Sequence, residues 1–256
     1  MKDVLGSVKC HNEKDCKILV ADFVSPEGYT SSYGVHLADE LSAEFARQKN
    51  SIPVADRGLL EKQLNVLREE RVPADLQRSP SVMRWLGKQL NASVVLVGVI
   101  EGHTSDGIQI SAHFLSVKDE KLQSPTAGAA LPLPASPEEL AAVNPLPALP
   151  PLPTTVNGET IYQSGIGGVG LPRCHYMPNP PYTDQAREFR LSGTLVIEGI
   201  VDTNGTIRHF RVVRGLPFGL NEISAKTMTA WKCDPANLEG KPVSAYVPFE
   251  ITFQLY

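Results

Sequence analysis

A proline-rich stretch between residues 125 and 153 constrains the fold of this chain more than any other feature. It holds nine prolines. Proline fixes φ at about −65° and lacks the N–H donor that helices and sheets need. The stretch is therefore expected to form an extended, semi-rigid spacer outside helices and sheets, except that 137–143 (PEELAAV) could form one helical turn. A proline-rich ligand for a groove-binding domain is the alternative. At about 3.1 Å per residue, the spacer could reach about 90 Å.

This spacer predicts three parts: a domain at residues 1–124, a Pro/Gly-rich linker at 125–171 and a second domain at 172–256. A chain of 256 residues suits two small domains. Its 42% apolar and 20% charged residues are typical of a globular protein. The glycine-rich run at 165–170 lacks the preceding strand and the following Lys-Ser/Thr of a phosphate-binding loop, so a flexible end of the linker is expected there.

Charge and hydropathy restrict the partners of the protein. The net charge of −4 is spread evenly along the chain and predicts no nucleic-acid partner. No run of about 18 apolar residues is present, so no transmembrane segment is expected. The first residues, MKDVLGSVKC, lack the apolar core of a signal peptide. Either the chain carries no targeting signal, or it is the mature part of a longer precursor.

The first part of the chain alternates between strand-like and helix-like patterns. Short β-branched runs indicate buried strands, and apolar residues at helical spacing indicate amphipathic helices. Asp56 is placed to cap one of these helices. Such an alternation is typical of an α/β sandwich. The expected strands lie at 17–24, 52–55, 92–100 and 107–117, and the expected helices lie at 33–48, after Asp56, and at 81–91.

Three motifs in this part resemble the family of the curli-secretion protein CsgG and the flagellar outer-membrane protein FlgO. They are 19–23 (LVADF), 54–57 (VADR) followed by Leu60, and 86–92 (LGKQLNA) leading into 96–98 (LVG). Their order and spacing fit over about 100 residues, from 17 to 117. The family's pore-forming insertions are absent from this sequence, so the resemblance does not imply a channel.

The last part of the chain predicts a small antiparallel sheet with one packed helix, in the order strand, strand, helix, strand. Asn-Gly at 204–205 favours a tight hairpin turn. Asn221 is placed to cap the helix, and Pro235 lies beyond its end. A short helix is expected first, at 182–191. The expected strands lie at 193–202, 206–214 and 243–255, and the packed helix lies at 221–231.

The same part resembles the TonB C-terminal domain family. The resemblance rests on motifs in unbroken order: 181–182 (PY), 193–196 (GTLV), 201–205 (VDTNG), 212–215 (VVRG), 219–221 (GLN), 230–231 (AW), 234–236 (DPA) and 240–243 (GKPV). It implies a periplasmic module that captures an extended segment of an outer-membrane receptor by strand addition, in the service of transmembrane transport. Two departures argue for a reused adaptor rather than a complete energy transducer: there is no N-terminal membrane helix, and Cys233 stands where the family usually has an aromatic residue.

The strand at 243–255 is the expected docking edge. Proline cannot donate to a β-ladder and is confined largely to edge strands, and Pro248 lies in the middle of this one. The apolar set is expected to pack under the helix: Val243, Ala245, Val247, Phe249, Ile251, Phe253 and Leu255. The expected partner-binding residues are Ser244, Tyr246, Val247, Pro248, Glu250, Thr252 and Gln254. An exposed edge is a liability unless it is used or blunted, and blunting by Pro248 is the alternative to use.

No catalytic or metal-binding pattern emerges, so we expect neither an enzyme nor a cofactor. The histidines are scattered, and Cys174, His175 and Cys233 offer too few ligands for a zinc site. Cys10 and Cys16 either close a small disulfide loop or stay free thiols. The sequence thus predicts a protein-binding module of the periplasm or cell envelope. The alternative is a structural component that forms homo-oligomers through its N-terminal domain.

Overall fold

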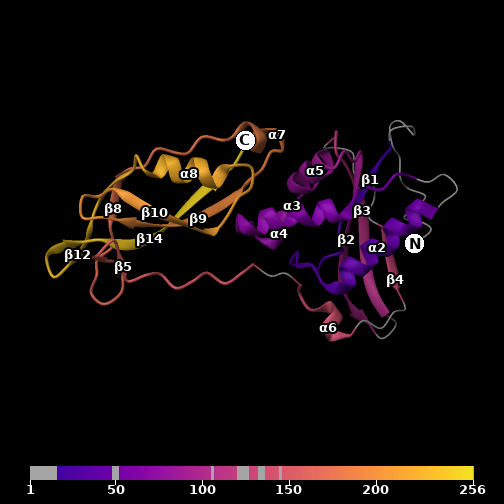
Figure 1. Cartoon of the computed structure of the whole chain (residues 1–256), viewed down its shortest axis with the longest axis horizontal. Coiled ribbons are helices and arrows are strands. Elements are labelled where there is room, and N and C mark those ends of the chain that lie inside the picture. The colour runs from indigo at the N-terminus through magenta and orange to yellow at the C-terminus, as the bar shows by residue number, and fades with distance from the viewer. Residues whose placement is uncertain are drawn as a thin grey trace. The chain divides into compact units, whose positions relative to one another are not determined.

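The computed structural model describes residues 16–47, 52–104, 107–119, 127–131, 136–143 and 146–255. The chain divides into two compact units (Figure 1). The N-terminal unit comprises Met1–Val66 and Ala74–Leu146, and the C-terminal unit comprises Leu67–Pro73 and Pro147–Tyr256. Within the described ranges, none of the helices is long and apolar enough to span a membrane.

A four-stranded sheet forms the centre of the N-terminal unit, with the strand order β1-β2-β3-β4. β1 runs parallel to β2, and the other neighbours are antiparallel. β1 and β2 are apolar runs, and Leu19, Val95 and Leu96 are fully buried. The bounds are β1 (Ile18–Val20), β2 (Val94–Thr104), β3 (Gly107–Ser116) and β4 (Ala127–Leu131).

Helices complete this unit, and their first turns show why they begin where they do. The Asp56 carboxylate accepts hydrogen bonds from the Gly58 and Leu59 N–H groups at 2.8 and 3.4 Å. Ser79 accepts from the Val82 N–H, with Pro80 as the first helical residue, a position where a missing donor costs nothing. The bounds are α2 (Ser32–Arg47), α3 (Arg57–Glu69), α4 (Ala74–Gln77), α5 (Pro80–Gln89) and α6 (Pro137–Leu140).

The expectation that the proline-rich stretch stays out of sheets is wrong at β4. β4 pairs with β3 over five residues, because the run 127–131 (AGAAL) contains no proline and so keeps every N–H donor. The helical turn expected within 137–143 is present as α6, which begins with a capping box between Ser136 and Glu139. Prolines flank β4 in the sequence, whereas Pro137 opens α6 at the first helical position, where a missing N–H donor costs nothing.

The C-terminal unit contains a second four-stranded sheet, with the strand order β10-β9-β14-β7. The order strand, strand, helix, strand predicted from the sequence is confirmed in β9 (Gly193–Val201), β10 (Ile207–Arg214), α8 (Leu220–Met228) and β14 (Ala245–Phe253). Figure 1 shows α8 lying along one face of this sheet. The smaller elements are β5 (Thr155–Val156), β6 (Glu159–Thr160), β7 (Tyr162–Gln163), β8 (Arg173–Tyr176), α7 (Asp184–Glu188), β11 (Lys232–Asp234), β12 (Ala236–Leu238) and β13 (Lys241–Val243).

The turn between β9 and β10 follows the Asn-Gly signal. The Asp202 carboxylate accepts from the N–H groups of Asn204 and Thr206 at 2.9 and 3.1 Å. Gly205 has φ of 76°, and a Cβ atom there would lie 1.8 Å from the Cys233 carbonyl oxygen. The turn thus needs glycine both for its conformation and for the close approach of β11.

The predicted N-cap of α8 is wrong. The helix begins at Leu220, after Gly219 in the left-handed region. Asn221 lies inside the first turn and is 5% exposed, where its side-chain oxygen accepts from the Leu216 N–H at 2.8 Å. Its side chain therefore holds the chain leading into the helix rather than the helix end.

Candidate binding edge

β14 is paired along its whole length on one side and along only two residues on the other. It is antiparallel to β9 from Ala245 to Phe253. On the opposite side, β7 runs parallel to it at Ala245 and Tyr246. Within the described part of the chain, no strand pairs with that side of β14 beyond Tyr246. Most of β14 is therefore a sheet edge.

Hydrogen bonds from β7 define which main-chain groups of β14 face outward. The Tyr162 N–H donates to the Ser244 carbonyl at 3.0 Å, and the Ser164 N–H donates to the Tyr246 carbonyl at 3.3 Å. In an antiparallel pair, alternate residues direct both main-chain groups away from the partner strand. Since Ser244 and Tyr246 face away from β9, the main chains of Pro248, Glu250 and Thr252 do so as well.

Pro248 fits this register. It lies opposite Glu198 of β9, at a position whose main chain faces outward, so the ladder with β9 needs no N–H donor there. The outward-facing groups beyond Tyr246 are thus the Pro248 carbonyl and both main-chain groups of Glu250 and Thr252. This row of groups is what an added strand requires.

The side chains of β14 separate into a buried and an exposed face. Phe249, Ile251 and Phe253 are buried. The Trp231 ring meets Phe249 edge-on at 5.4 Å between centroids, and Tyr182 meets Phe253 likewise at 5.2 Å. The alternating residues Pro248, Glu250, Thr252 and Gln254 are exposed. The predicted alternation is therefore confirmed between Pro248 and Phe253.

Two of the predicted partner-binding residues lie under other parts of the chain. Ser244 is 2% exposed and Tyr246 is 8% exposed. The Ser244 hydroxyl donates to the Glu159 carboxylate, and Tyr246 packs in an apolar cluster with Ile161 and Ile200. Burial raises the pKa of Tyr246, although the nearby Arg211 and Arg208 oppose this rise. Val247 is half-buried, and its main chain faces β9.

Charged side chains near this cluster neutralise one another. The Arg208 guanidinium pairs with Glu159. The Arg211 guanidinium pairs with Glu198 and also donates to the Pro150 carbonyl at 2.6 Å. Glu159 and Ile161 were missed as contacts of the sheet because they fall in the predicted linker. The only signal for them is the short alternating run at 159–164 (ETIYQS).

A disulfide joins Cys174 of β8 to Cys233 of β11, across 59 residues of sequence. The two cysteines are direct partners in the antiparallel pair. Their positions in the sequence do not indicate this bond. In the described residues, no group of three or more His, Cys, Asp or Glu could hold a metal ion. Of the other predicted pair, Cys16 is buried, and Cys10 lies outside the described residues.

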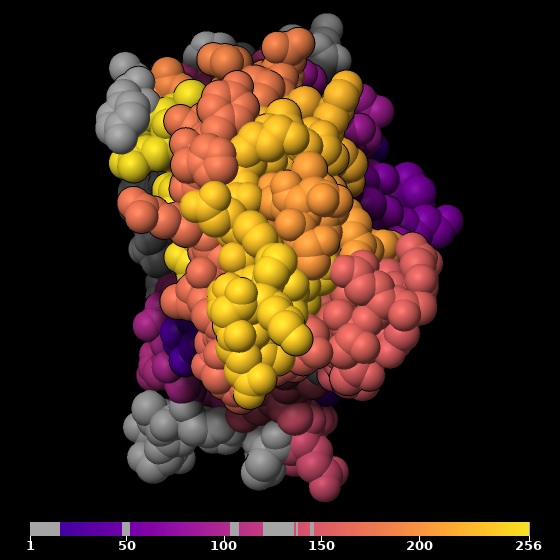
Figure 2. All heavy atoms as spheres, turned by 90° about the vertical axis from the view of Figure 1, so that its left-hand side faces the viewer, coloured from indigo at the N-terminus to yellow at the C-terminus, as the bar shows by residue number. Residues whose placement is uncertain are grey.

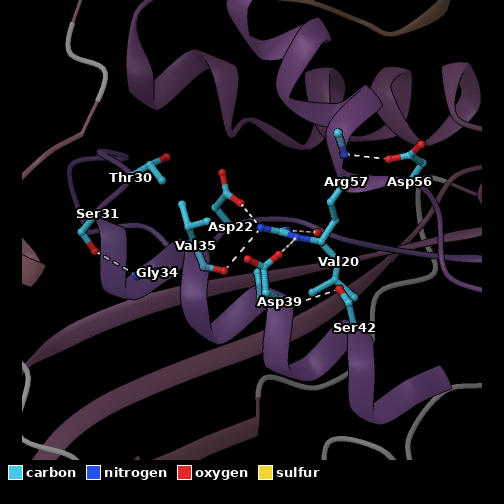
Figure 3. A network of polar contacts seen from close by, with 12 residues as sticks. Val20, Asp22, Thr30, Ser31, Gly34, Val35, Asp39, Ser42, Asp56 and Arg57 are labelled. Atoms are coloured by element: carbon cyan, nitrogen blue, oxygen red, sulfur yellow. Dashed lines mark hydrogen bonds and ion pairs between the residues drawn. The ribbon is translucent and has the colours of Figure 1, made fainter. Parts of the chain in front are cut away.

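The N-terminal unit contains a polar network around the buried Asp22 (Figure 3). Arg57 donates to Asp22 at 2.8 Å and to Asp39 at 2.6 Å, and also to the Val20 carbonyl at 2.8 Å. Arg78 donates to Asp22 at 3.2 Å and to the Thr30 hydroxyl at 2.8 Å. These bonds run between elements of the unit itself, which makes the network a structural cross-link.

Comparison with known proteins locates a family in the C-terminal unit. Residues 178–255 match the model of the family described as Gram-negative bacterial TonB protein C-terminal. This part of the chain is a TonB-like C-terminal domain. The match covers β9, β10, α8 and β14 with their connections, and it leaves the segment that contains β7 outside.

Several solved structures are similar to the chain. The solution structure of the TonB C-terminal domain from Pseudomonas aeruginosa is 18% identical, over 36% of this chain and 93% of that one, with a TM-score of 0.27. The C-terminal domain of LpoB from Escherichia coli is 12% identical, over 51% and 92%, with a TM-score of 0.35. Lipoprotein GNA1162 from Neisseria meningitidis is 13% identical, over 45% and 79%, with a TM-score of 0.35.

None of the curated proteins matches the chain. The resemblance of residues 17–117 to the CsgG and FlgO family is not shown by these matches and stays a hypothesis.

Proposed function

We propose that this protein is a non-enzymatic adaptor of the cell envelope that captures an extended segment of an outer-membrane partner on the free edge of β14. One observation carries the proposal. The main chains of Pro248, Glu250 and Thr252 face outward from the part of β14 that pairs with β9 on one side and, among the described residues, with no strand on the other. The match of residues 178–255 to the TonB C-terminal model supports the same mode, in which an extended peptide adds a strand.

The energetics favour a short and reversible contact. Each main-chain hydrogen bond contributes a net of about 0.5–1.5 kcal/mol, and the free edge offers two donors and three acceptors at residues 248–252. Ordering the captured segment costs about 1–2 kcal/mol per residue. Main-chain bonds alone therefore give weak binding, and side-chain contacts of the partner must supply the rest. A transient contact of this kind suits a module that engages and releases a transport protein.

The role of the N-terminal unit in this proposal is to hold the adaptor in place. Residues 17–117 resemble the CsgG and FlgO family, whose members are proteins of the outer membrane and its secretion systems. We infer a periplasmic or envelope location for the whole chain on this ground and from the TonB-like domain. The alternative is an assembly component in which the N-terminal unit forms homo-oligomers and the C-terminal unit only supports them.

Two measurements test the proposal. A library of extended peptides from the periplasmic ends of outer-membrane receptors is screened by calorimetry. Hydrogen exchange of the protein then shows which of its amides the best-binding peptide protects. Protection of the Glu250 and Thr252 amides supports capture on β14. Protection confined to other strands, or no binder in the library, contradicts it. Light scattering addresses the alternative, because a large ring-like assembly supports the structural role and a monomer supports the adaptor.

A further inference from the structure

A strand from the predicted linker already occupies part of the edge. β7 lies parallel to β14 at Ala245 and Tyr246. The Ser164 hydroxyl adds a second hydrogen bond to the Tyr246 carbonyl at 2.7 Å. The edge formed by β14 and the preceding Ser244 is thus divided into a closed part, residues 244–246, and an open part, residues 248–252.

The segment before β7 is fixed to the face of the sheet. Ile161 is 4% exposed and packs against Ile200 and Tyr246, with Leu152 and Val156 beside them. Glu159 meets Arg208 and the Ser244 hydroxyl from the same side. Apolar burial and charge pairing together hold the residues that lead into β7, so they behave as part of the domain rather than as a free tether.

The segment after β7 is fixed as well. Val169 is buried with Ala236 and Ala245, and the Gly170 N–H donates to the Asn237 carbonyl at 2.8 Å. Figure 2 shows this end of the unit, where coral atoms lie beside the yellow atoms of the last part of the chain. β7 is therefore anchored on both sides.

The chain leaves the edge directly after Ser164. The Gly165 N–H donates to the Val169 carbonyl at 2.9 Å, and Gly165 has φ of 78°, which glycine adopts without strain. The departure coincides with Pro248, the next outward-facing position of β14. A continued strand would find no N–H donor there, so the boundary between closed and open parts is built into both strands.

We propose that residues 159–164 are a resident strand that closes residues 244–246 of the edge and restricts partner capture to residues 248–252. This inference rests on the proposed function. Without the resident strand, the whole edge would be free and the Ile200–Tyr246 pair would lose its contact with Ile161. Any long extended segment could then pair with the edge, including β14 of a second copy. With it, only a short segment fits, aligned end to end with β7.

The first test uses the unmodified chain. The Tyr246 N–H donates to the resident strand. Among the described residues, no strand pairs with the N–H groups of Glu250 and Thr252. Hydrogen exchange should therefore be slow at Tyr246 and fast at Glu250 and Thr252. Equal and fast exchange at all three amides would overturn the resident strand without any variant being made.

The second test opens the closed part of the edge in the full chain. Tyr162→Pro with Ser164→Pro removes the two main-chain donors of the resident strand, and Tyr162→Ala with Ser164→Ala keeps them. The probe is a synthetic peptide with the chain's own residues 158–165. Exchange at Tyr246 should rise about tenfold or more in the proline variant, and the peptide should bind this variant and restore protection. The alanine variant and the unmodified chain should not bind it.

Two results contradict the proposal and leave the proposed function standing. One is binding of the peptide to the unmodified chain as tightly as to the proline variant, because the strand would then exchange freely. The other is unchanged exchange at Tyr246 in a proline variant that keeps slow exchange at Phe249 and Ile251. Failure of the proposed function gives a different result. In that case no receptor peptide protects the Glu250 and Thr252 amides from exchange, and the Tyr246 amide still exchanges slowly.

Discussion

Arg57 donates a hydrogen bond from its Nη2 to Asp22 Oδ1 at 2.8 Å, and so joins two sequence motifs that lie 35 residues apart. Asp22 follows β1 in the motif LVADF, and Arg57 opens α3 in the motif VADR. Both side chains are largely buried, at 5% and 15% exposure. The ion pair between Asp22 and Arg57 therefore holds the start of α3 against the end of β1. This structural role explains both residues without a ligand.

Asp22→Ala should destabilise the N-terminal unit strongly. The substitution removes the buried counter-charge of the Arg57 guanidinium. Removing one partner of a buried ion pair costs about 3–5 kcal/mol. Asp39→Ala is the matched control, because Asp39 contacts the same guanidinium but is 60% exposed. An exposed pair contributes only about 0–1 kcal/mol. Urea unfolding followed by Trp85 fluorescence, in a Trp231→Phe background, measures both changes. Equal effects of the two substitutions would contradict the account.

The β14 part of the candidate site can be predicted from sequence for a local reason. A strand with one face on the core and one in solvent alternates with period two, and β14 places Phe249 and Ile251 inside and Pro248 and Glu250 outside. Asn204 and Gly205 likewise mark the hairpin, because their conformational preferences are properties of single residues. Each of these signals is read within a few residues of the feature that it predicts.

The closed part of the edge could not be predicted, because its partners are distant. Ser164 and Tyr246 are 82 residues apart, and β7 is a parallel strand with one buried apolar neighbour, Ile161, in a segment rich in glycine and proline. The Cys174–Cys233 disulfide could not be predicted for the same reason. Four cysteines allow three pairings, and the pairing that joins Cys10 to Cys16 also joins Cys174 to Cys233, but nothing local in the sequence marks a bond that spans 59 residues.

Removing the Cys174–Cys233 disulfide should lower the free energy of unfolding of the C-terminal unit. Closing a loop of about 60 residues restricts the unfolded chain by roughly 4 kcal/mol in the chain-entropy account. Cys174→Ser with Cys233→Ser should approach this loss in urea unfolding, followed by Trp231 fluorescence in a Trp85→Phe background. Reductant should destabilise this unit in the parent protein and have far less effect in the double variant. A change below about 1 kcal/mol would contradict the entropic account.

Asp202 should make the C-terminal unit sensitive to acid. Burial tends to raise the pKa of its carboxyl, but hydrogen bonds from Thr206 and Asn204 and the charge of Arg208 outweigh this and lower it below its ordinary value. A carboxylate with a lowered folded-state pKa stabilises the fold above its unfolded pKa of about 4 and loses that contribution as pH falls through the folded value. Asp202→Ala should therefore cost about 1–2 kcal/mol at pH 7, and the cost should shrink below about pH 4.

The matched control for this acid effect is Asp202→Asn. It keeps an oxygen that can accept from the Asn204 and Thr206 N–H groups but does not titrate. Its stability should fall less with acid than that of the parent protein, when both are measured by urea unfolding between pH 7 and pH 3. Parallel pH profiles for the parent and both variants would show that Asp202 does not carry the effect.

Proline at the outward donors of β14 should abolish partner capture and leave the sheet intact. Glu250 and Thr252 direct their N–H groups away from β9, so the loss of either donor removes no bond of the native ladder. Pro248, at the preceding outward position, shows that the strand accepts proline there. Glu250→Pro and Thr252→Pro should each lower the affinity for the best peptide of the receptor library about tenfold or more in calorimetry.

The controls are alanine substitutions at the same positions. Glu250→Ala and Thr252→Ala keep the donors, and their affinity should stay within about threefold of that of the parent protein. Ile251→Pro removes a donor that faces β9 and should instead unfold the unit, which circular dichroism distinguishes from lost binding. If both folded proline variants bound as tightly as the parent protein, capture would not use the main chain of β14.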